Sequence, residues 1–270
     1  VSAIDDFNEM ATVGSNDDID IVVQFDRIAG NAGAGSGYDD WTTTHRFRIT
    51  KDMKPHSSNA ITDWGDGQGG REVDMSDSAE LVNFVNWAVA NYPSDSYILV
   101  MWNHGGGWRK KSANGSSSGA ASRSNRALIW DSSASGEPSM KMPDLRRAHA
   151  QTNLFKSGKK IDILGVDVCL AGMIEVAFEI ADYAYVMTAS QRTAPGDGWP
   201  YNTILSALSA NIQTYSTENL ATQIVDKYYA AYTDPSLNIT QAAYRLNQIP
   251  ILKTAIDNFA NALCSANIWT

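Results

Sequence analysis

Two apolar runs in this chain each lead into a side chain that can do nucleophilic or acid–base chemistry. The run Tyr97–Trp102 is followed by His104, and the run Ile161–Val168 is followed by Cys169. Both runs are typical of buried strands, and the carboxyl ends of parallel strands meet at the edge of an open α/β sheet where such folds place their active sites. A thiolate beside an imidazole is a nucleophile with its proton carrier, so the pair indicates acyl-transfer chemistry.

The residues around this pair offer the other parts of such a site. We expect Cys169 at a strand-to-helix turn, near a positive helix terminus that favours its thiolate. The N–H of Cys169 and an N–H of the glycines after His104 then provide donors for an oxyanion. Asp131 ends a strand of its own and either orients His104 or lies in a solvated turn. Taken alone, Cys169 is more often a buried small hydrophobe than a nucleophile.

Helical and strand patterns alternate along the chain that must position these residues. Strand patterns cover residues 20–25, 46–49, 97–102, 127–131, 160–168, 185–189 and 240–246. Helical patterns cover residues 77–92, 143–151, 173–181, 216–232 and 251–263. Repeated βα units predict an α/β fold with a mostly parallel central sheet between layers of helices, formed as one domain of residues 1–270. Because Ile4–Met10 is typical of a helix already under way, we expect an N-terminal part of the domain to be missing.

Composition excludes several functional classes. Acidic residues number 30 against 21 basic ones, a net charge of −9, which argues against nucleic acid as a partner and favours cationic ligands or calcium. No apolar run approaches the roughly 18 to 20 residues that span a bilayer, so we predict no membrane span.

The cysteines and remaining histidines indicate neither a disulfide scaffold nor a metal site. The chain has only two cysteines, Cys169 and Cys264, which are too few for a disulfide scaffold. Cys264 fits the apolar pattern of the last helix, so we expect its side chain in the core. His45, His56 and His149 lack partners at metal-ligand spacing and are expected on the surface.

Three motifs have an order and spacing that are typical of one protein family. They are His-Gly-Gly-Gly-Trp at 104–108, Asp-Val-Cys-Leu at 167–170 and Pro-Gly-Asp-Gly-Trp-Pro-Tyr at 195–201. Together they resemble the clostripain family of cysteine peptidases, relatives of caspases, gingipains and legumain, and the resemblance covers most of the chain. It implies a caspase-like α/β/α sandwich with a Cys-His dyad. Cys169 would be the nucleophile, His104 the general acid and base, and the Gly105 N–H an oxyanion donor.

The resemblance also implies a substrate preference. Members of the family cleave after Arg or Lys, and Asp167 stands where the family carries an acidic residue at the base of its primary specificity pocket. A carboxylate there pairs with a guanidinium or an ammonium. The alternative is that Asp167 caps the following helix or accepts backbone N–H bonds. The family is mainly bacterial and exported, which implies a secreted or envelope-associated protein. Some relatives, but not all, depend on calcium, so the resemblance allows calcium as a cofactor and implies no other.

The chain departs from the family pattern at two positions. Val168 stands where alanine is common, a packing change that leaves the dyad untouched. Gln191 stands where an acidic residue is common, so we assign Gln191 no role.

The polar stretch at 109–126 is too poor in apolar residues to pack, so we predict an exposed loop. Related enzymes are activated by cleavage between the catalytic histidine and cysteine, and proteolysis concentrates where backbone is exposed. We therefore expect self-cleavage after Lys110, Lys111, Arg123 or Arg126. The alternative is a basic loop that is only solvated.

These observations favour an endopeptidase acting on protein or peptide substrates with Arg or Lys before the scissile bond. The competing hypothesis is a catalytically silent protein of the same fold that holds a peptide in a cleft between Trp108 and Trp199. Retention of both His104 and Cys169 argues against it.

Overall fold

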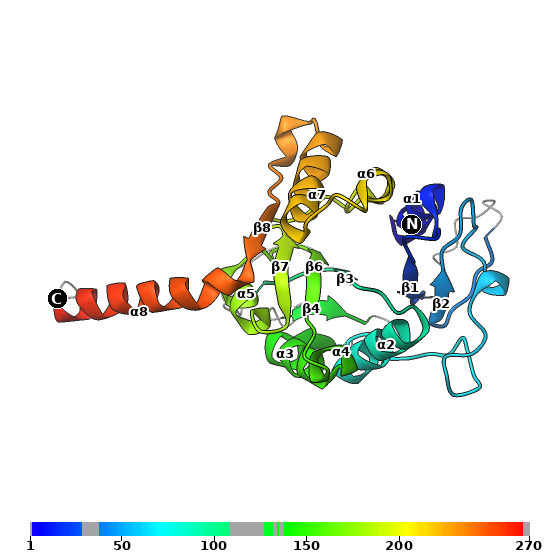
Figure 1. Ribbon diagram of the computed structural model, residues 1–270, viewed down its shortest axis with the longest axis horizontal. Helices are drawn as coiled ribbons and strands as arrows, with labels where there is room; N and C mark the ends of the chain where they lie inside the picture. Colours follow the sequence, from blue (N-terminus) through cyan, green and yellow to red (C-terminus); the bar gives the residue numbers. More distant parts are fainter. Residues whose placement is uncertain (1, 29–37, 108–126, 132–133, 135–137, 267–270) are drawn as a thin grey trace, which may run out of the picture.

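The computed structural model describes residues 2–28, 38–107, 127–131, 134 and 138–266 (Figure 1). The glycine-rich stretch at 29–37, Trp108 and the predicted basic loop at 109–126 lie outside these residues. In the described part, a central sheet is covered by helices on both faces, so the molecule has three layers (Figure 1).

The central sheet has four strands in the order β3-β6-β7-β8. They are β3 (Ile98–Trp102), β6 (Ile161–Asp167), β7 (Ala184–Ala189) and β8 (Ala242–Arg245). β3, β6 and β7 are parallel, and β8 runs antiparallel to β7 at the edge. This arrangement confirms the predicted mostly parallel sheet.

The helices divide between the two faces of the sheet (Figure 1). One layer holds α2 (Ser78–Asn91), α3 (Met142–Gln151), α4 (Asn153–Lys156) and α5 (Ile174–Ile180). The opposite layer holds α1 (Ser2–Val13), α6 (Tyr201–Asn211) and α7 (Thr217–Ala231). The predicted start of α2 is confirmed, because the Asp77 carboxylate accepts the Ala79 N–H at 2.8 Å as an N-cap.

Two short antiparallel pairs lie outside the central sheet. They are β1 (Val22–Phe25) with β2 (His45–Arg48), and β4 (Ala127–Trp130) with β5 (Ser139–Lys141). Short 3₁₀ turns cover Ser57–Asn59, Pro235–Leu237 and Leu246–Gln248.

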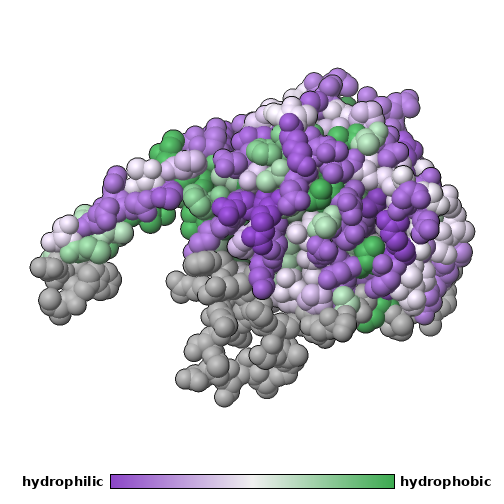
Figure 2. Space-filling view, turned by 90° about the horizontal axis from the view of Figure 1, so that it is seen from below, coloured by the Kyte–Doolittle hydropathy of each residue, from purple (hydrophilic) through white to green (hydrophobic). Residues whose placement is uncertain are grey.

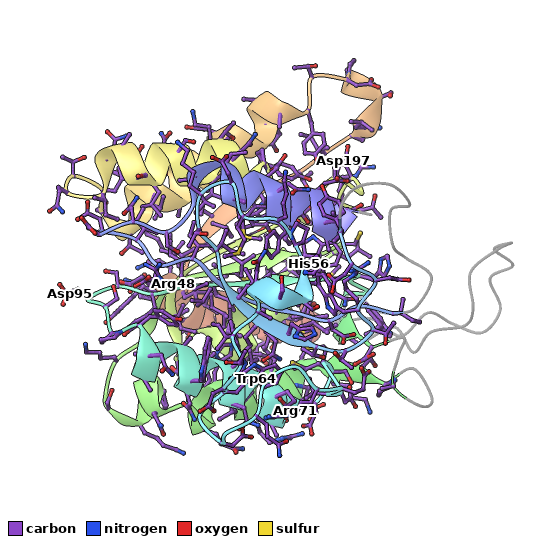
Figure 3. All side chains as sticks on the ribbon, turned by 90° about the vertical axis from the view of Figure 1, so that its right-hand side faces the viewer. Arg48, His56, Trp64, Arg71, Asp95 and Asp197 are labelled. Atoms are coloured by element: carbon purple, nitrogen blue, oxygen red, sulfur yellow. The ribbon has the colours of Figure 1, made fainter. Side chains whose placement is uncertain are left out.

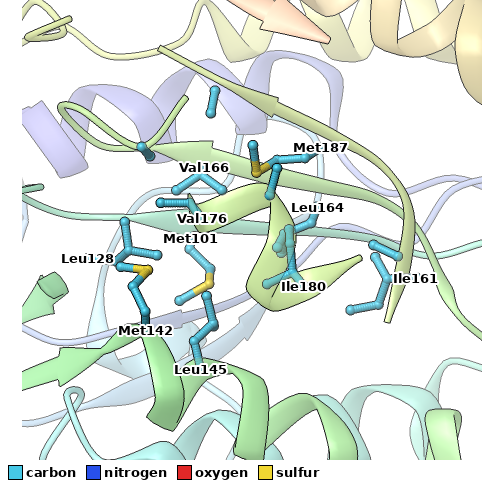
Figure 4. Close-up of a cluster of buried hydrophobic side chains, with 14 of the residues drawn as sticks. Met101, Leu128, Met142, Leu145, Ile161, Leu164, Val166, Val176, Ile180 and Met187 are labelled. Carbon is cyan, nitrogen blue, oxygen red and sulfur yellow. The ribbon is translucent and has the colours of Figure 1, made fainter. Parts of the chain in front are cut away.

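Each face of the sheet has its own apolar core. On the α3/α5 side, Met101 and Leu164 pack with Leu145 and Ile180 (Figure 4). On the α6/α7 side, the cluster is formed by Ile163, Val186, Trp199, Tyr201, Ile204, Leu208, Leu220, Ala221, Ile224 and Tyr228. Full burial of one such side chain contributes roughly 1.5 to 3 kcal/mol. These two cores hold the carboxyl ends of β3 and β6 in place.

Two sequence predictions about burial are wrong. Cys264 is exposed, because α8 (Ile249–Ser265) projects from the body and leaves apolar side chains such as Ile251 and Phe259 uncovered (Figures 1 and 2). His149 is buried and stacks on Tyr183, and burial lowers the pKa of its imidazole to about 4.

Candidate active site

The β3–β6 register brings the His104 and Cys169 segments to the same edge of the sheet. Trp102 and Asp167 are paired residues of these parallel strands, and each reactive residue follows its strand by two positions. His104 is exposed and Cys169 is half-buried, so both are accessible to a substrate. The predicted placement at one edge is therefore seen in the structure.

Gly105 lies directly against the cysteine. A Cβ added to Gly105 would sit 1.9 Å from the carbonyl oxygen of Cys169 and 2.8 Å from a methyl carbon of Val168. No side chain fits in that space. The contact shows that the segment after His104 and the turn that carries Cys169 touch through their backbones.

Asn103 fixes the backbone of His104. Its side-chain amide donates to the Trp130 carbonyl at 3.0 Å, and its Oδ1 accepts the N–H groups of Trp130 at 3.3 Å and His104 at 2.6 Å. Gly106 adds a second tie to β4, since its N–H donates to the Ala127 carbonyl at 3.0 Å. The sequence analysis gave Asn103 no role, although its place directly before the histidine was a signal.

The environment of the sulfur differs from the sequence prediction. Helix α5 begins only at Ile174, so Cys169 does not lie at a helix N-terminus. Instead, Cys169 Sγ accepts the N–H of Ala194 at 3.3 Å. The carbonyl oxygen of the same residue lies 3.9 Å from Sγ, so the sulfur is held against the backbone of Ala194.

The turn that carries the cysteine is held in a strained shape. Leu170 has φ +60°, a left-handed conformation that non-glycine residues rarely adopt. Its N–H donates to the Arg192 carbonyl at 2.9 Å, and the Gly172 N–H donates to the Ser190 carbonyl at 2.7 Å. The loop that follows β7 is therefore hydrogen-bonded to the turn beside the sulfur and holds that turn in place.

Two backbone donors next to the sulfur are unused. Within the described part of the chain, neither the Gly105 N–H nor the Cys169 N–H makes a hydrogen bond. Unpaired backbone donors are uncommon in folded proteins. Both belong to residues whose backbones touch.

Asp167 is buried beside this edge, with 4% of its surface exposed. Its Oδ2 accepts the Trp199 N–H at 3.0 Å and the Tyr201 hydroxyl at 2.9 Å, whereas its Oδ1 has no hydrogen-bond partner among the described residues. Burial raises the pKa of this carboxyl to about 6, against the two hydrogen bonds, which lower it. The capping alternative is wrong because α5 starts too far away, but one oxygen does accept a backbone N–H, as that alternative also allowed.

Further carboxyl groups near this edge act on Asp6, and among them the sequence indicated a role for Asp167 alone. Asp6 and Glu9 come from α1, and Asp197 comes from the loop before α6 (Figure 3). Burial, followed by the charge of Asp167, raises the pKa of Asp6 to about 8. Burial also raises the pKa of Glu9, against the first N–H groups of α6, which lower it. The effect of the Asp167 charge on Asp6 distinguishes Asp6 from an ordinary helix acid.

Asp131 is buried and engaged in backbone contacts. Its Oδ2 accepts the Met75 N–H at 2.8 Å, and its Oδ1 accepts the Ala134 N–H at 3.1 Å. These bonds tie the end of β4 to the segment before α2. Its orienting role toward His104 stays a prediction.

Trp199 belongs to the core and does not line an open cleft. Its ring lies over Gly165, where an added Cβ would sit 2.7 Å from a ring carbon, and only 2% of Trp199 is exposed. The predicted cleft between Trp108 and Trp199 is therefore not one that Trp199 can line. Trp102, by contrast, is 40% exposed at the end of β3.

Among the described residues, no group of three or more His, Cys, Asp or Glu side chains is arranged to hold a metal ion. No helix in that part of the chain is long and apolar enough to cross a membrane.

Comparison with known proteins gives one consistent family. A family model described as the clostripain family of peptidases matches residues 2–268. Clostripain of Hathewaya histolytica is 29% identical over 224 residues, which are 73% of this chain and 40% of that protein. The chain thus spans less than half the length of this curated relative.

Solved structures share the fold. A secreted C11 cysteine protease from Bacteroides thetaiotaomicron, in complex with an irreversible peptide inhibitor, has a TM-score of 0.63 at 21% identity, over 94% of this chain and 65% of that one. An inactive zymogen C11 protease from Parabacteroides distasonis has a TM-score of 0.57 at 17% identity, over 93% and 58% of the two chains. At these identities the likeness establishes the architecture, which is the caspase-like sandwich that the sequence predicted.

Proposed function

Since the chain belongs to the clostripain family, we propose that it is a cysteine endopeptidase that cleaves after Arg or Lys through Cys169 and His104. The observation that carries this proposal is the backbone contact between Gly105 and Cys169, which joins the histidine and cysteine segments at one edge of the sheet. Packing of a hydrophobic core does not require the histidine and cysteine segments to lie together, whereas a nucleophile and the residue that carries its proton must be close to each other.

In this mechanism the Cys169 thiolate attacks the carbonyl carbon of the scissile peptide bond. The carbonyl oxygen becomes an oxyanion, which accepts hydrogen bonds from the N–H groups of Gly105 and Cys169. His104 gives its proton to the leaving amine as the C–N bond breaks, which leaves a thioester on the sulfur. His104 then takes a proton from water, whose hydroxide displaces the sulfur and releases the acid.

Two neighbours support these roles. The Ala194 N–H donates to Cys169 Sγ at 3.3 Å and positions the sulfur, and the three hydrogen bonds of Asn103 fix the backbone that carries the imidazole. Pre-set donors cost no reorganisation during the reaction, which is the main reason that such sites are fast.

Asp167 supplies the specificity in this proposal. Its Oδ2 is saturated by Trp199 and Tyr201, so the carboxylate is held rigidly, while Oδ1 is left to accept a donor from the substrate. A buried carboxylate with one free oxygen is a strong partner for a guanidinium or an ammonium.

We further propose that the protein acts outside the cytoplasm.

We also propose that the chain cleaves itself after Lys110, Lys111, Arg123 or Arg126. This self-cleavage is tested by following purified wild type and Cys169→Ala on denaturing gels. Two chains are expected from the wild type and one from the variant. Equal behaviour of both over a long incubation contradicts self-cleavage.

The activity is tested with fluorogenic Arg and Lys peptides on the processed protein, with and without iodoacetamide, and with calcium or a chelator added. Turnover that iodoacetamide abolishes supports the peptidase, and dependence on calcium would add that ion as a cofactor. Tight peptide binding without turnover of any Arg or Lys substrate supports the silent binding protein instead.

A further inference from the structure

A turn in the loop between β7 and α6 lies directly against Asp167. Pro195 and Gly198 close this turn, because the Gly198 N–H donates to the Pro195 carbonyl at 3.2 Å. Gly198 has φ +64°, which a residue without a side chain adopts readily. A Cβ added there would lie 2.9 Å from Asp167 Oδ2, so the backbone of the turn is in contact with the carboxyl group.

The peptide unit between Gly198 and Trp199 is hydrogen-bonded on both sides. Its N–H, which belongs to Trp199, donates to Asp167 Oδ2 at 3.0 Å. Its carbonyl, which belongs to Gly198, accepts the Tyr232 hydroxyl at 2.5 Å. The N–H and C=O of a trans peptide share one plane and point in opposite directions, so the bond from Tyr232 fixes the direction of the N–H. The same bond polarises the peptide and strengthens its N–H as a donor.

Packing of α7 sets the position of the Tyr232 hydroxyl. Tyr232 directly follows α7, and its ring packs on the fully buried Tyr228 with the ring centroids 5.0 Å apart. Both rings belong to the apolar core on the α6/α7 side of the sheet. The hydroxyl therefore reaches Gly198, 34 residues earlier in the chain, from a rigid base.

We propose that Tyr232 is a positioning residue of the specificity pocket, which holds the 198–199 peptide so that Asp167 presents Oδ1 to the cationic side chain of the substrate. This inference rests on the proposed function. The Tyr201 hydroxyl, at 2.9 Å, is the second donor to Oδ2, so two bonds from different directions fix the rotation of the carboxylate. Oδ1 makes no hydrogen bond in the described part of the chain and, unlike Asp6 Oδ2, is not enclosed from solvent. A substrate cation can reach it.

The kinetic test compares Tyr232→Phe with Tyr215→Phe. Tyr215 packs against the same core, and its hydroxyl makes no hydrogen bond with the described residues, so the chemical change is matched. In Tyr232→Phe, KM for an Arg peptide is expected to rise roughly threefold to tenfold, the effect of one lost hydrogen bond, with little change in kcat. Tyr215→Phe should keep the wild-type values. An unchanged KM in Tyr232→Phe, or a fall in kcat alone, overturns the inference.

The pH dependence of benzamidine inhibition separates positioning from a general loss of packing. Burial raises the pKa of Asp167 to about 6, and the bond from the Trp199 N–H opposes that rise. Without Tyr232 to hold the peptide, this bond weakens and the pKa of Asp167 rises further. The pH at which inhibition is half lost should therefore be higher in Tyr232→Phe than in wild type and Tyr215→Phe. A loss of affinity that is equal at every pH overturns the positioning role.

Other charges do not change between these proteins. Burial raises the pKa of Tyr232 above its usual range, so its hydroxyl is neutral between pH 5 and pH 8 and Tyr232→Phe removes no charge. The other titratable groups that interact electrostatically with Asp167 are kept in both variants; they are Asp6, Tyr201 and Tyr228. A shift in the pH profile thus reports on the hydrogen bonds of Asp167.

A binding test needs no turnover. Acetyl-arginine amide is titrated calorimetrically into the Cys169→Ala protein, alone and combined with Tyr232→Phe or Tyr215→Phe. Its Kd is expected to rise roughly threefold to tenfold with Tyr232→Phe only. Equal Kd values in all three proteins overturn the inference and leave the peptidase proposal intact, whereas wild type that binds arginine amide but cleaves no Arg peptide overturns only the peptidase. Failure of Cys169→Ala to bind arginine amide excludes Asp167 as the cation site and overturns the inference with it.

Discussion

The Cβ position of Gly105 lies 1.9 Å from the carbonyl oxygen of Cys169, closer than any carbon atom can approach. The glycine after His104 is therefore a steric requirement, because only a residue without a side chain lets the two backbones touch. Among the described residues, the N–H groups of Gly105 and Cys169 make no hydrogen bond.

Gly105→Ala is expected to separate these segments and to lower kcat by roughly 10²-fold or more, because one oxyanion donor is displaced. The control is Gly196→Ala, where an added Cβ meets nothing within 4 Å. Steady-state kinetics on an Arg peptide measure the effect. Comparable activity of the two variants would mean that the Gly105 donor does not serve the reaction.

Cys169→Ala is expected to abolish turnover without loss of folding, since the half-buried thiol hydrogen-bonds only to the backbone of Ala194 among the described residues. Cys264→Ala is the matched control, because that cysteine is exposed on the projecting α8. Labelling with iodoacetamide should inactivate the wild type and Cys264→Ala alike. Residual activity in Cys169→Ala would assign the nucleophile to another residue.

Asn103→Ala removes the three hydrogen bonds that fix His104 to β4. We expect kcat to fall roughly 10- to 100-fold with little change in KM, because the imidazole loses its position while the specificity pocket stays. Asn83→Ala, on the exposed face of α2, controls for the general loss of an amide. A rise in KM with unchanged kcat would place Asn103 in substrate binding instead.

Asp167 should make cation binding depend on pH. Its pKa of about 6 means that the carboxylate is lost as the pH falls below that value, so competitive inhibition by benzamidine should weaken from pH 7 to pH 5. Benzamidine should inhibit the Asp167→Asn variant only weakly at both pH 7 and pH 5. Inhibition of wild type that is equally strong at pH 5 would show that Asp167 does not hold the cation.

Asp6 should make stability depend on pH in the opposite sense from a paired carboxylate. Its pKa rises from an ordinary 3.8 to about 8 in the folded state, so its contribution to stability is complete below pH 4 and is lost progressively up to about pH 8. Relative to Asp6→Asn, the wild type should lose on the order of a few kcal/mol of unfolding free energy over that range. Denaturant unfolding at pH 5 and pH 9 measures this, with Asp5→Asn as control; parallel behaviour of all three proteins would contradict it.

Local signals were enough to predict most of the fold. The Asp77 cap marks the start of α2, and the apolar runs before His104 and Cys169 mark β3 and β6 to within one residue. Cap chemistry and strand periodicity are properties of neighbouring residues, so they can be recognised without knowing the fold. Helix α6 was not predicted from the sequence.

The sequence by itself predicted which residues would carry the chemistry and that two parallel strands bring them to one edge of a sheet, because the apolar runs and the order of the residues can be recognised along the chain. Only the tertiary structure decided what surrounds them. Three relationships join segments far apart in the sequence. They are the hydrogen bond from the Ala194 N–H to the Cys169 sulfur, the hydrogen bond from Asn103 to Trp130 of β4, and the effect of the Asp167 charge on Asp6. Packing of helices against the sheet sets such contacts, and it equally decided that His149 is buried and that Cys264 is exposed.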